Sequence, residues 1–181
     1  MKHSISMLLF LLLLSVAVHS QTNNCTTAID TEVKGEIIRI KSTQSYLTFN
    51  SKSGELKLTF DLKSLDGEFD TLDAFFDTRD DQFIFSGKLN GNLFDQLNLQ
   101  KNSDSNFPIT GLLTLNQITD DVNGNYGIFK FSNERDEPLR NLRFSLSLHF
   151  SPKDFGIQKI LPQLTNEISI QINEAIVTVI E

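Results

Sequence analysis

Few side chains beyond the first 20 residues have the chemistry needed for catalysis. That part of the chain holds one histidine, His149, and one cysteine, Cys25. His149 alternates with apolar residues in the run Leu142–Phe150, which is typical of a solvated side chain on the polar face of a strand. Nucleophilic catalysis needs a nucleophile with a base in reach, and no serine lies in a nucleophile-elbow sequence. We therefore assign no catalytic residue and expect a protein that is not an enzyme.

Metal binding is not predicted either. One histidine and one cysteine are too few for a zinc site of the usual composition. Residues 121–125, Asp-x-Asn-x-Asn, resemble the opening of a calcium loop. However, Tyr126 stands where that loop needs a glycine, and Ser132 where it needs a bidentate glutamate. The acidic residues within 77–81 are interpreted as a solvated loop, and we assign no metal and no cofactor.

Phenylalanine is the residue type that stands out. The chain has 15 phenylalanines, two tyrosines and no tryptophan. Small β-barrels fill their interiors with such side chains, while somewhat larger ones leave room for one ligand. Period-two alternation predicts that the following side chains face inward: Phe60, Phe129, Phe144, Leu146, Leu148 and Ile170. Periodicity alone leaves a packed core and a ligand-holding interior open as alternatives.

The elements that position these side chains are short strands. Strict alternation predicts strands at 55–62, 82–89, 142–150 and 168–172, and weaker patterns add 35–40, 46–50, 109–115, 126–131 and 175–180. Turn residues lie between them, including Asn50–Gly54 and Asn123-Gly124, a pair that favours a tight hairpin because both residues tolerate positive φ. Short helical turns are expected at 89–99 and 155–164. The pattern predicts a single all-β domain, a barrel or sandwich of eight or nine strands.

The N-terminus predicts export from the cytoplasm. A basic start at Lys2 precedes an apolar run from Met7 to Val18, which is shorter than the ~20 residues of a membrane-spanning helix. Residues 1–20 are therefore expected to be a signal peptide that is cleaved before Gln21. Residues 21–34, with Cys25, are expected to be a flexible N-terminal tail. The barrel domain is assigned to residues 35–181, in the periplasm or outside the cell.

Charge excludes one class of partner. The whole chain carries a formal charge of −7, and because Lys2 is the only charged residue among the first 20, the mature chain carries −8. An acidic protein without basic runs is repelled by the phosphates of nucleic acids and by anionic membrane surfaces. We exclude nucleic-acid binding on this ground, and membrane spanning because no later apolar stretch approaches the length of a spanning helix. The sequence leaves open whether two barrels pair as a homodimer.

Four short motifs occur in the order found in one known family. Residues 111–119, GLLTLNQIT, resemble the G-x-L-T-L-x-G-V-T segment of the YceI-like family, and residues 153–157, KDFGI, are similar to its R-x-D-F-G-I motif. Upstream, residues 72–77, LDAFFD, and 82–86, QFIFS, are similar to the family's S-x-D-F-F-D and F-x-S pair. The resemblance covers roughly residues 54 to 181. It ends in what resembles a closing strand pair, Glu167–Ile172 and Ala175–Ile180.

The resemblance implies an extended, lipocalin-like antiparallel barrel of about eight strands that binds a long apolar ligand, an isoprenoid or other lipid. It implies the following barrel-lining positions, of which Phe83 and Phe85 also face inward by period-two alternation: Phe75, Phe76, Phe83, Phe85, Leu113, Leu115 and Phe155. The chain departs from the family pattern at two places: the family's basic stretch before D-F-F-D is missing, and Asp120 replaces a lysine. A polar or charged head group of the ligand would therefore find fewer partners here. A non-catalytic interaction module with a packed core, acting through its acidic surface, is the alternative function.

Overall fold

A computed structural model describes residues 20–33, 35–50, 53–67, 80–89, 106–131, 141–159, 161–162, 164 and 167–178. Within these ranges the side chains of residues 20–23, 129–131, 141–142 and 177–178 are not described. Phe75 and Phe76 lie outside the described residues. So do most of the predicted signal peptide and the helical turns expected after Leu89.

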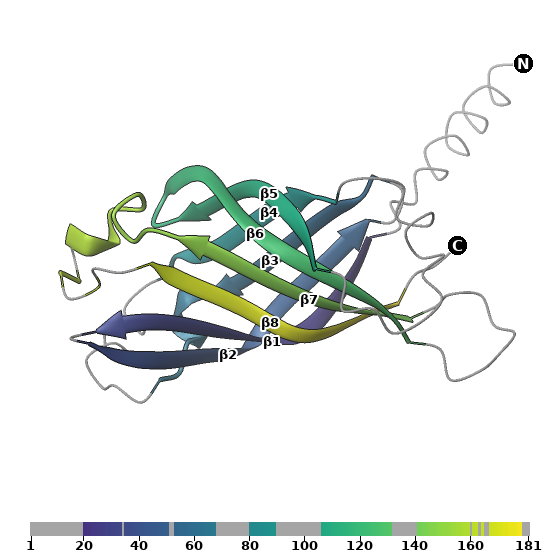
Figure 1. Ribbon diagram of the computed structural model, residues 1–181, viewed down its shortest axis with the longest axis horizontal. Coiled ribbons are helices and arrows are strands. Elements are labelled where there is room, and N and C mark those ends of the chain that lie inside the picture. The colour runs from purple at the N-terminus through teal and green to yellow at the C-terminus, as the bar shows by residue number, and fades with distance from the viewer. Residues whose placement is uncertain are drawn as a thin grey trace, which may run out of the picture.

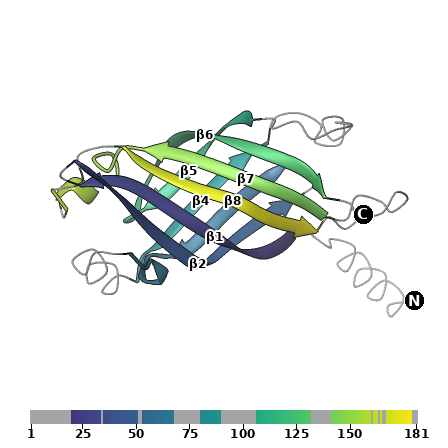
Figure 2. The same cartoon turned by 60° about the horizontal axis from the view of Figure 1, so that its bottom comes forward.

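Eight antiparallel strands form a closed barrel in which each strand pairs with its neighbours in the chain and β8 pairs with β1 (Figures 1 and 2). The strands are β1 Ser20–Val33, β2 Glu36–Asn50, β3 Glu55–Asp61, β4 Gln82–Lys88, β5 Asn106–Leu115, β6 Ile118–Phe131, β7 Asn141–Phe150 and β8 Ile168–Thr178. Among the described residues, the only helices are two 3-10 turns, η1 Leu62–Ser64 and η2 Ile157–Lys159. The predicted fold, an all-β antiparallel barrel of about eight strands with short helical turns, is confirmed.

Two β-bulges explain why the sequence predicts more strands than the barrel has. In β2 the inward-facing residues run through Ser42 and then resume at Ser45, because two residues of β2 lie opposite the single residue Thr26 of β1. In β8 the register shifts in the same way opposite Ser145 of β7. A bulge reverses the parity of the alternation, so each long strand resembles two short ones in sequence. The expected closing strand pair at the C-terminus is therefore one strand, and that prediction was wrong.

The predicted N-terminal tail is also corrected by the structure. Residues 20–33 form β1, which pairs with β2 along its length and with β8 through Ala28, Ile29 and Asp30. This strand closes the barrel. Sequence patterns missed it because several of its inward-facing residues, such as Thr27 and Thr31, are polar rather than apolar.

The hairpin between β5 and β6 turns at a different place from the one predicted. Asn123 and Gly124 lie inside β6, paired with Thr110 and Ile109 of β5. The turn is made by Asn116 and Gln117, whose φ angles are 51° and 62°. Positive φ at both central residues of a two-residue loop matches the right-handed twist of the flanking strands. Gln117 occupies the position at which the G-V-T segment has a glycine, which is the residue type that adopts positive φ without strain.

Gln117→Gly is expected to raise the free energy of unfolding by about 0.5–1 kcal/mol, since the left-handed conformation costs a non-glycine residue ~1–2 kcal/mol and glycine loses part of that gain to backbone entropy. Urea denaturation measures the change. Asn116→Gly is the matched control, because asparagine tolerates positive φ and its Nδ2 donates a hydrogen bond to the Phe155 carbonyl at 3.1 Å. We expect no gain from the control, and a Gln117→Gly variant less stable than wild type would contradict the turn.

The segment after β7 covers one end of the barrel. Phe155, Leu161 and Leu164 are at most 7% exposed, and Phe155 contacts Phe150 edge to face with ring centroids 5.2 Å apart. Leu164 also forms a β-bridge with Val33 near the β1–β2 turn. Helix in the predicted 155–164 region is limited to η2 among the described residues. These three side chains therefore belong to the same apolar core as the barrel interior.

Candidate ligand-binding interior

The predicted barrel-lining residues lie on the inner face of the barrel. The ten whose side chains the structure describes are at most 5% exposed: Phe60, Phe83, Phe85, Leu113, Leu115, Phe144, Leu146, Leu148, Phe155 and Ile170. Phe75, Phe76 and the side chain of Phe129 lie outside the described set, so their placement stays a prediction. These ten residues come from β3, β4, β5, β7 and β8 and from the segment that covers the end, and they belong to one apolar cluster.

The sequence missed part of this lining. Leu47, Leu56, Leu58 and Ile109 are also buried on the inner face, at 0–1% exposure. Tyr126 of β6 is 1% exposed and its ring lies 5.4 Å from that of Phe107, and burial raises the pKa of its hydroxyl. Leu56 and Leu58 stood in a recognised alternating run and were accessible to prediction. Tyr126 was not, because the predicted strand 126–131 placed Phe129 inward, and alternation then puts Tyr126 on the opposite face.

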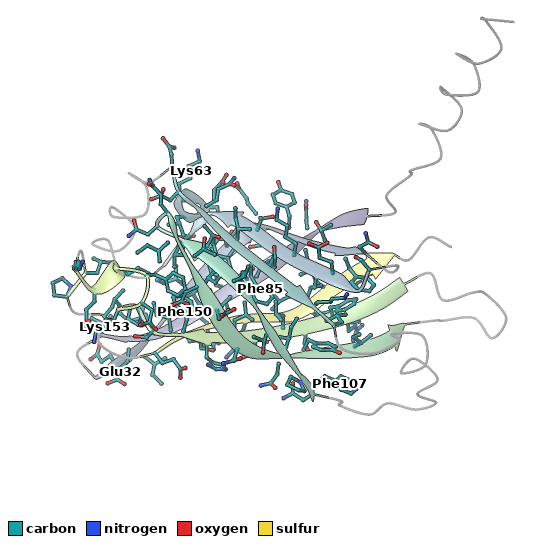
Figure 3. The ribbon with its side chains drawn as sticks, turned by 90° about the horizontal axis from the view of Figure 1, so that it is seen from above. Glu32, Lys63, Phe85, Phe107, Phe150 and Lys153 are labelled. Atoms are coloured by element: carbon teal, nitrogen blue, oxygen red, sulfur yellow. The ribbon has the colours of Figure 1, made fainter. Side chains whose placement is uncertain are left out.

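Phe85 lies in the middle of the barrel (Figure 3). It belongs to a row of paired inward residues on four strands, Leu47, Leu58, Phe85 and Leu113, each 0% exposed. Complete burial means that no void large enough for water lies against these side chains. The middle of the interior is therefore closely packed by side chains that belong to the wall.

Glycines make room for the Phe85 ring. Gly87 and Gly111 are paired on β4 and β5, and a Cβ at either position would lie 2.7–2.8 Å from an atom of the Phe85 ring. Real Cβ atoms do not approach so closely, so the ring occupies the space that side chains would fill at these two positions. Gly124 on β6 is a third inward-facing glycine, and its missing side chain leaves room for Leu148.

Aromatic contacts also cross the interior. Phe49 of β2 and Phe144 of β7 approach with ring centroids 5.3 Å apart, although two other strands separate β2 from β7 around the barrel. Phe60 and Phe83, on neighbouring strands, stack at 4.5 Å. Such pairs contribute ~0.5–1.5 kcal/mol beyond their burial.

The fold has solved counterparts. A polyisoprenoid binding domain from Saccharophagus degradans, implicated in plant cell wall breakdown, matches with a TM-score of 0.68 at 10% identity, over 90% of this chain and 99% of that chain. BcnA of Burkholderia cenocepacia matches with a TM-score of 0.61 at 12% identity, over 84% and 96% of the two chains. A YCEI protein from Campylobacter jejuni matches at 0.52 and 19% identity, over 76% and 81%.

The chain has a YceI-like fold. The resemblance predicted from the four ordered motifs is thus confirmed for the architecture. No protein-family model and no curated protein matches the sequence. At these identities the similarity concerns the fold, and the ligand of this YceI-like barrel has to be argued from its own residues.

Polar side chains are rare inside the YceI-like barrel. Among the residues that the structure describes, the buried polar or charged ones are Thr27, Thr31, Ser42 and Ser45, and none of these is ionisable. All four come from β1 and β2. The interior therefore offers no charge to a ligand within the described set, and its buried serine and threonine hydroxyls are concentrated on one wall.

Cys25 lies beside these residues on the inner face of β1 and is 7% exposed, not in a flexible tail. Burial raises the pKa of its thiol from 9.0 to about 11, although the Thr27 hydroxyl and the backbone at Leu47 favour the thiolate. The thiolate is the reactive form of cysteine, so this thiol is held in its unreactive state at neutral pH.

We expect the Cys25 thiol to react with iodoacetamide far more slowly in the folded protein than in urea at about pH 8. The folded state binds the proton more tightly than the unfolded state. The contribution of the Cys25 thiol to the free energy of unfolding is therefore fully present below about pH 9 and is lost as the pH rises from about 9 to about 11. Urea denaturation at several pH values, with Cys25→Ala as the control that removes this contribution, measures the effect. Equally fast labelling of folded and unfolded protein would contradict the burial.

The other residues that were considered for catalysis or metal binding lie on the outer face of the barrel. His149 is exposed and its Nε2 lies 3.1 Å from the Ser147 hydroxyl, as expected for a solvated strand histidine. Asp121, Asn123 and Asn125 follow one another along the outer face of β6 in extended backbone, which is unlike a calcium loop. No metal-binding cluster and no helix long and apolar enough to cross a membrane occurs in the described part of the chain.

A depression of about 390 Å³ also lies on the outer face, over β3 to β6. Its lining includes Glu55, Lys88 and Asp121 with a single large apolar residue, Leu112. Charged walls are unsuited to a long apolar chain, because burying them would cost their hydration. The barrel interior remains the candidate site.

Proposed function

We propose that this protein, after export to the periplasm or the extracellular space, binds one long apolar ligand, an isoprenoid chain or other lipid, inside its barrel without catalysing a reaction. The observation that carries the proposal is the continuous apolar interior of a closed eight-stranded barrel. Ligand sites of this kind are concave and mostly apolar, with few polar groups. Barrels of about eight strands are wide enough for a single small ligand.

The length of the strands favours an elongated ligand. β2 has 15 residues, and β1 and β6 have 14 each. At ~3.3 Å per residue and a tilt of ~35–45°, these longest strands span ~35–40 Å along the barrel axis, while the 7-residue strands β3 and β4 span ~16–19 Å. A long, narrow interior without side chains that are charged at neutral pH in its described lining matches a linear hydrocarbon chain better than a compact or charged molecule.

Binding requires wall side chains to change rotamer. The Phe85 ring lies over Gly87 and Gly111, and these glycines give it no Cβ to pack against on the wall. Rotation of this ring would open space along the middle of the barrel, and the ligand would replace its apolar contacts. The name of the domain from Saccharophagus degradans, polyisoprenoid binding, supports a ligand of this class.

A second candidate function has its own supporting observation. The row of fully buried side chains around Phe85 and the Phe49–Phe144 contact across the barrel are also what a permanently packed core would show. In that case the barrel is a structural module that acts through its acidic surface. The two candidates differ in whether wild-type protein binds a long apolar molecule.

The test is a chain-length series with delipidated protein: geraniol, farnesol and geranylgeraniol, followed by isothermal titration calorimetry because the chain has no tryptophan for fluorescence. Since each added carbon contributes ~0.3 kcal/mol, affinity is expected to rise about tenfold per isoprene unit. Affinity that is absent, or that does not depend on chain length, would favour the structural module.

A further inference from the structure

A small group of polar side chains lies on the inner wall formed by β1 and β2. It consists of Cys25, Thr27, Ser42 and Ser45, which we name the polar patch. Cys25 pairs with Ser45 and Thr27 pairs with Ser42, on the two sides of the bulge in β2. Their exposures are 7%, 0%, 1% and 0%. The patch is therefore buried inside a mostly apolar barrel.

The hydroxyl of Ser42 is satisfied by its neighbours. Its Oγ lies 2.7 Å from Ser64 Oγ, which donates to the Asp61 carbonyl at 2.6 Å, and it accepts a hydrogen bond from the Gln44 amide at 3.1 Å. Since Ser64 uses its proton on Asp61, Ser42 donates to Ser64. This hydroxyl has both a donor and an acceptor partner and is explained by the structure of the wall.

The Ser45 hydroxyl has no hydrogen-bond partner although it is completely buried, and the equally buried Thr27 hydroxyl has no partner other than the adjacent Cys25 sulfur, which is a weak acceptor. A buried polar group without a partner is destabilising, and most such groups in proteins are paired with protein, water or a ligand. Valine and alanine would fit the same positions without this cost. Two buried hydroxyls on one wall without a strong hydrogen-bond partner are therefore better explained by a partner from outside the chain.

The chemistry of the patch selects the kind of partner. Each hydroxyl donates one hydrogen bond and accepts others, and the neighbouring Cys25 thiol is neutral. No Lys, Arg or His is buried beside it among the described residues, and an ionised group without a counter-charge is very costly to bury. A phosphate or an ionised carboxylate is thus disfavoured, whereas an uncharged oxygen is favoured.

We propose that the polar patch binds an uncharged oxygen of the ligand, a hydroxyl or a carbonyl, through the hydroxyls of Thr27 and Ser45. The inference rests on the proposed function and narrows it to lipid or isoprenoid alcohols and carbonyl compounds. The oxygen is held inside the barrel, and the chain runs along the apolar wall on either side.

The experiment compares three probes that share one hydrocarbon chain: geranylgeraniol, its analogue without the hydroxyl, and geranylgeranyl phosphate. Wild type is expected to bind the alcohol about tenfold more tightly than the hydrocarbon, which corresponds to one or two hydrogen bonds. In the double variant Thr27→Val, Ser45→Ala this preference disappears while hydrocarbon affinity is kept. Thr114→Val, on the outer face with its hydroxyl 2.8 Å from that of Thr119, is the matched control and keeps the preference.

Four other results would overturn the inference. Equal affinity for alcohol and hydrocarbon in wild type, or tightest binding of the phosphate, overturns the inference and leaves the proposed function standing. Failure to bind any of the three probes overturns both. The delipidated double variant is also expected to melt at or above the temperature of wild type, because the only hydrogen bond that is lost is the weak one to the Cys25 sulfur. A melting temperature lowered by many degrees would show that buried water already satisfies the hydroxyls and would overturn the inference.

Discussion

Phe85→Ala is expected to lower the free energy of unfolding of delipidated protein by about 3–5 kcal/mol. The side chain is 0% exposed, and its ring fills the space over Gly87 and Gly111. Neither glycine has a side chain that could relax into the void, so the cavity stays open and the cost lies at the upper end of the range. Urea or thermal denaturation measures it, with Leu112→Ala, at a residue 52% exposed on the outer face, as the control without a large effect.

The same variant is expected to bind a long isoprenoid alcohol more tightly than wild type, because the ligand no longer has to displace the ring. Enclosed apolar cavities left by such truncations bind apolar molecules. Ligand should therefore restore more of the melting temperature in the variant than it adds to wild type. If the truncated protein accepts only small aromatic molecules and wild type binds none of the long ones, the interior is a packed core.

Gly124→Ala is expected to destabilise the protein by about 3 kcal/mol, with Gly111→Ala close behind. A Cβ at position 124 would overlap the Ser147 carbonyl oxygen, and one at position 111 would overlap the Ser86 carbonyl oxygen. Both oxygens belong to the backbone of a neighbouring strand, which cannot move away without breaking the barrel's pairing. The loss in the free energy of unfolding therefore comes from moving two paired strands apart and not from rotating a side chain.

Gly87→Ala is the matched control for this pair of variants. Its Cβ would also meet atoms at 2.8 Å, but these are the ends of the Ile109 and Phe85 side chains, which have other rotamers. We expect a loss of about 1 kcal/mol. Denaturation curves for the three variants compare the effects, and a Gly87→Ala loss equal to that of Gly124→Ala would contradict the close strand approach at Gly124.

The strands that could be predicted are those without irregularity. In β3 and β4 the burial of side chains alternates along the whole strand, so period two alone places Phe60, Phe83 and Phe85 inward. In β2 and β8 a bulge reverses the parity part-way, and a one-dimensional pattern cannot separate a bulge from the end of a strand. β1 escaped prediction because its inner face is partly polar, and its pairing with β8 depends on the closure of the whole barrel.

The candidate site was predictable to a similar extent. Inward-facing apolar residues follow from alternation, and the ordered motifs around residues 111–119 and 153–157 indicated the architecture. The polar patch could not be predicted, because Thr27 and Ser45 become neighbours only through the β1–β2 register. The turn at Asn116 and Gln117 was missed since Asn123-Gly124 has the stronger local preference, which the extended pairing of β5 with β6 overrides.

The most direct test of the proposed function is native mass spectrometry of the protein purified from its own source under conditions that retain ligands. We predict one bound molecule per chain, which dissociates on collisional activation and is identified as a long apolar compound with an uncharged oxygen. Protein that carries no small molecule, and that also fails to take up such compounds when they are supplied, would contradict a ligand-binding barrel.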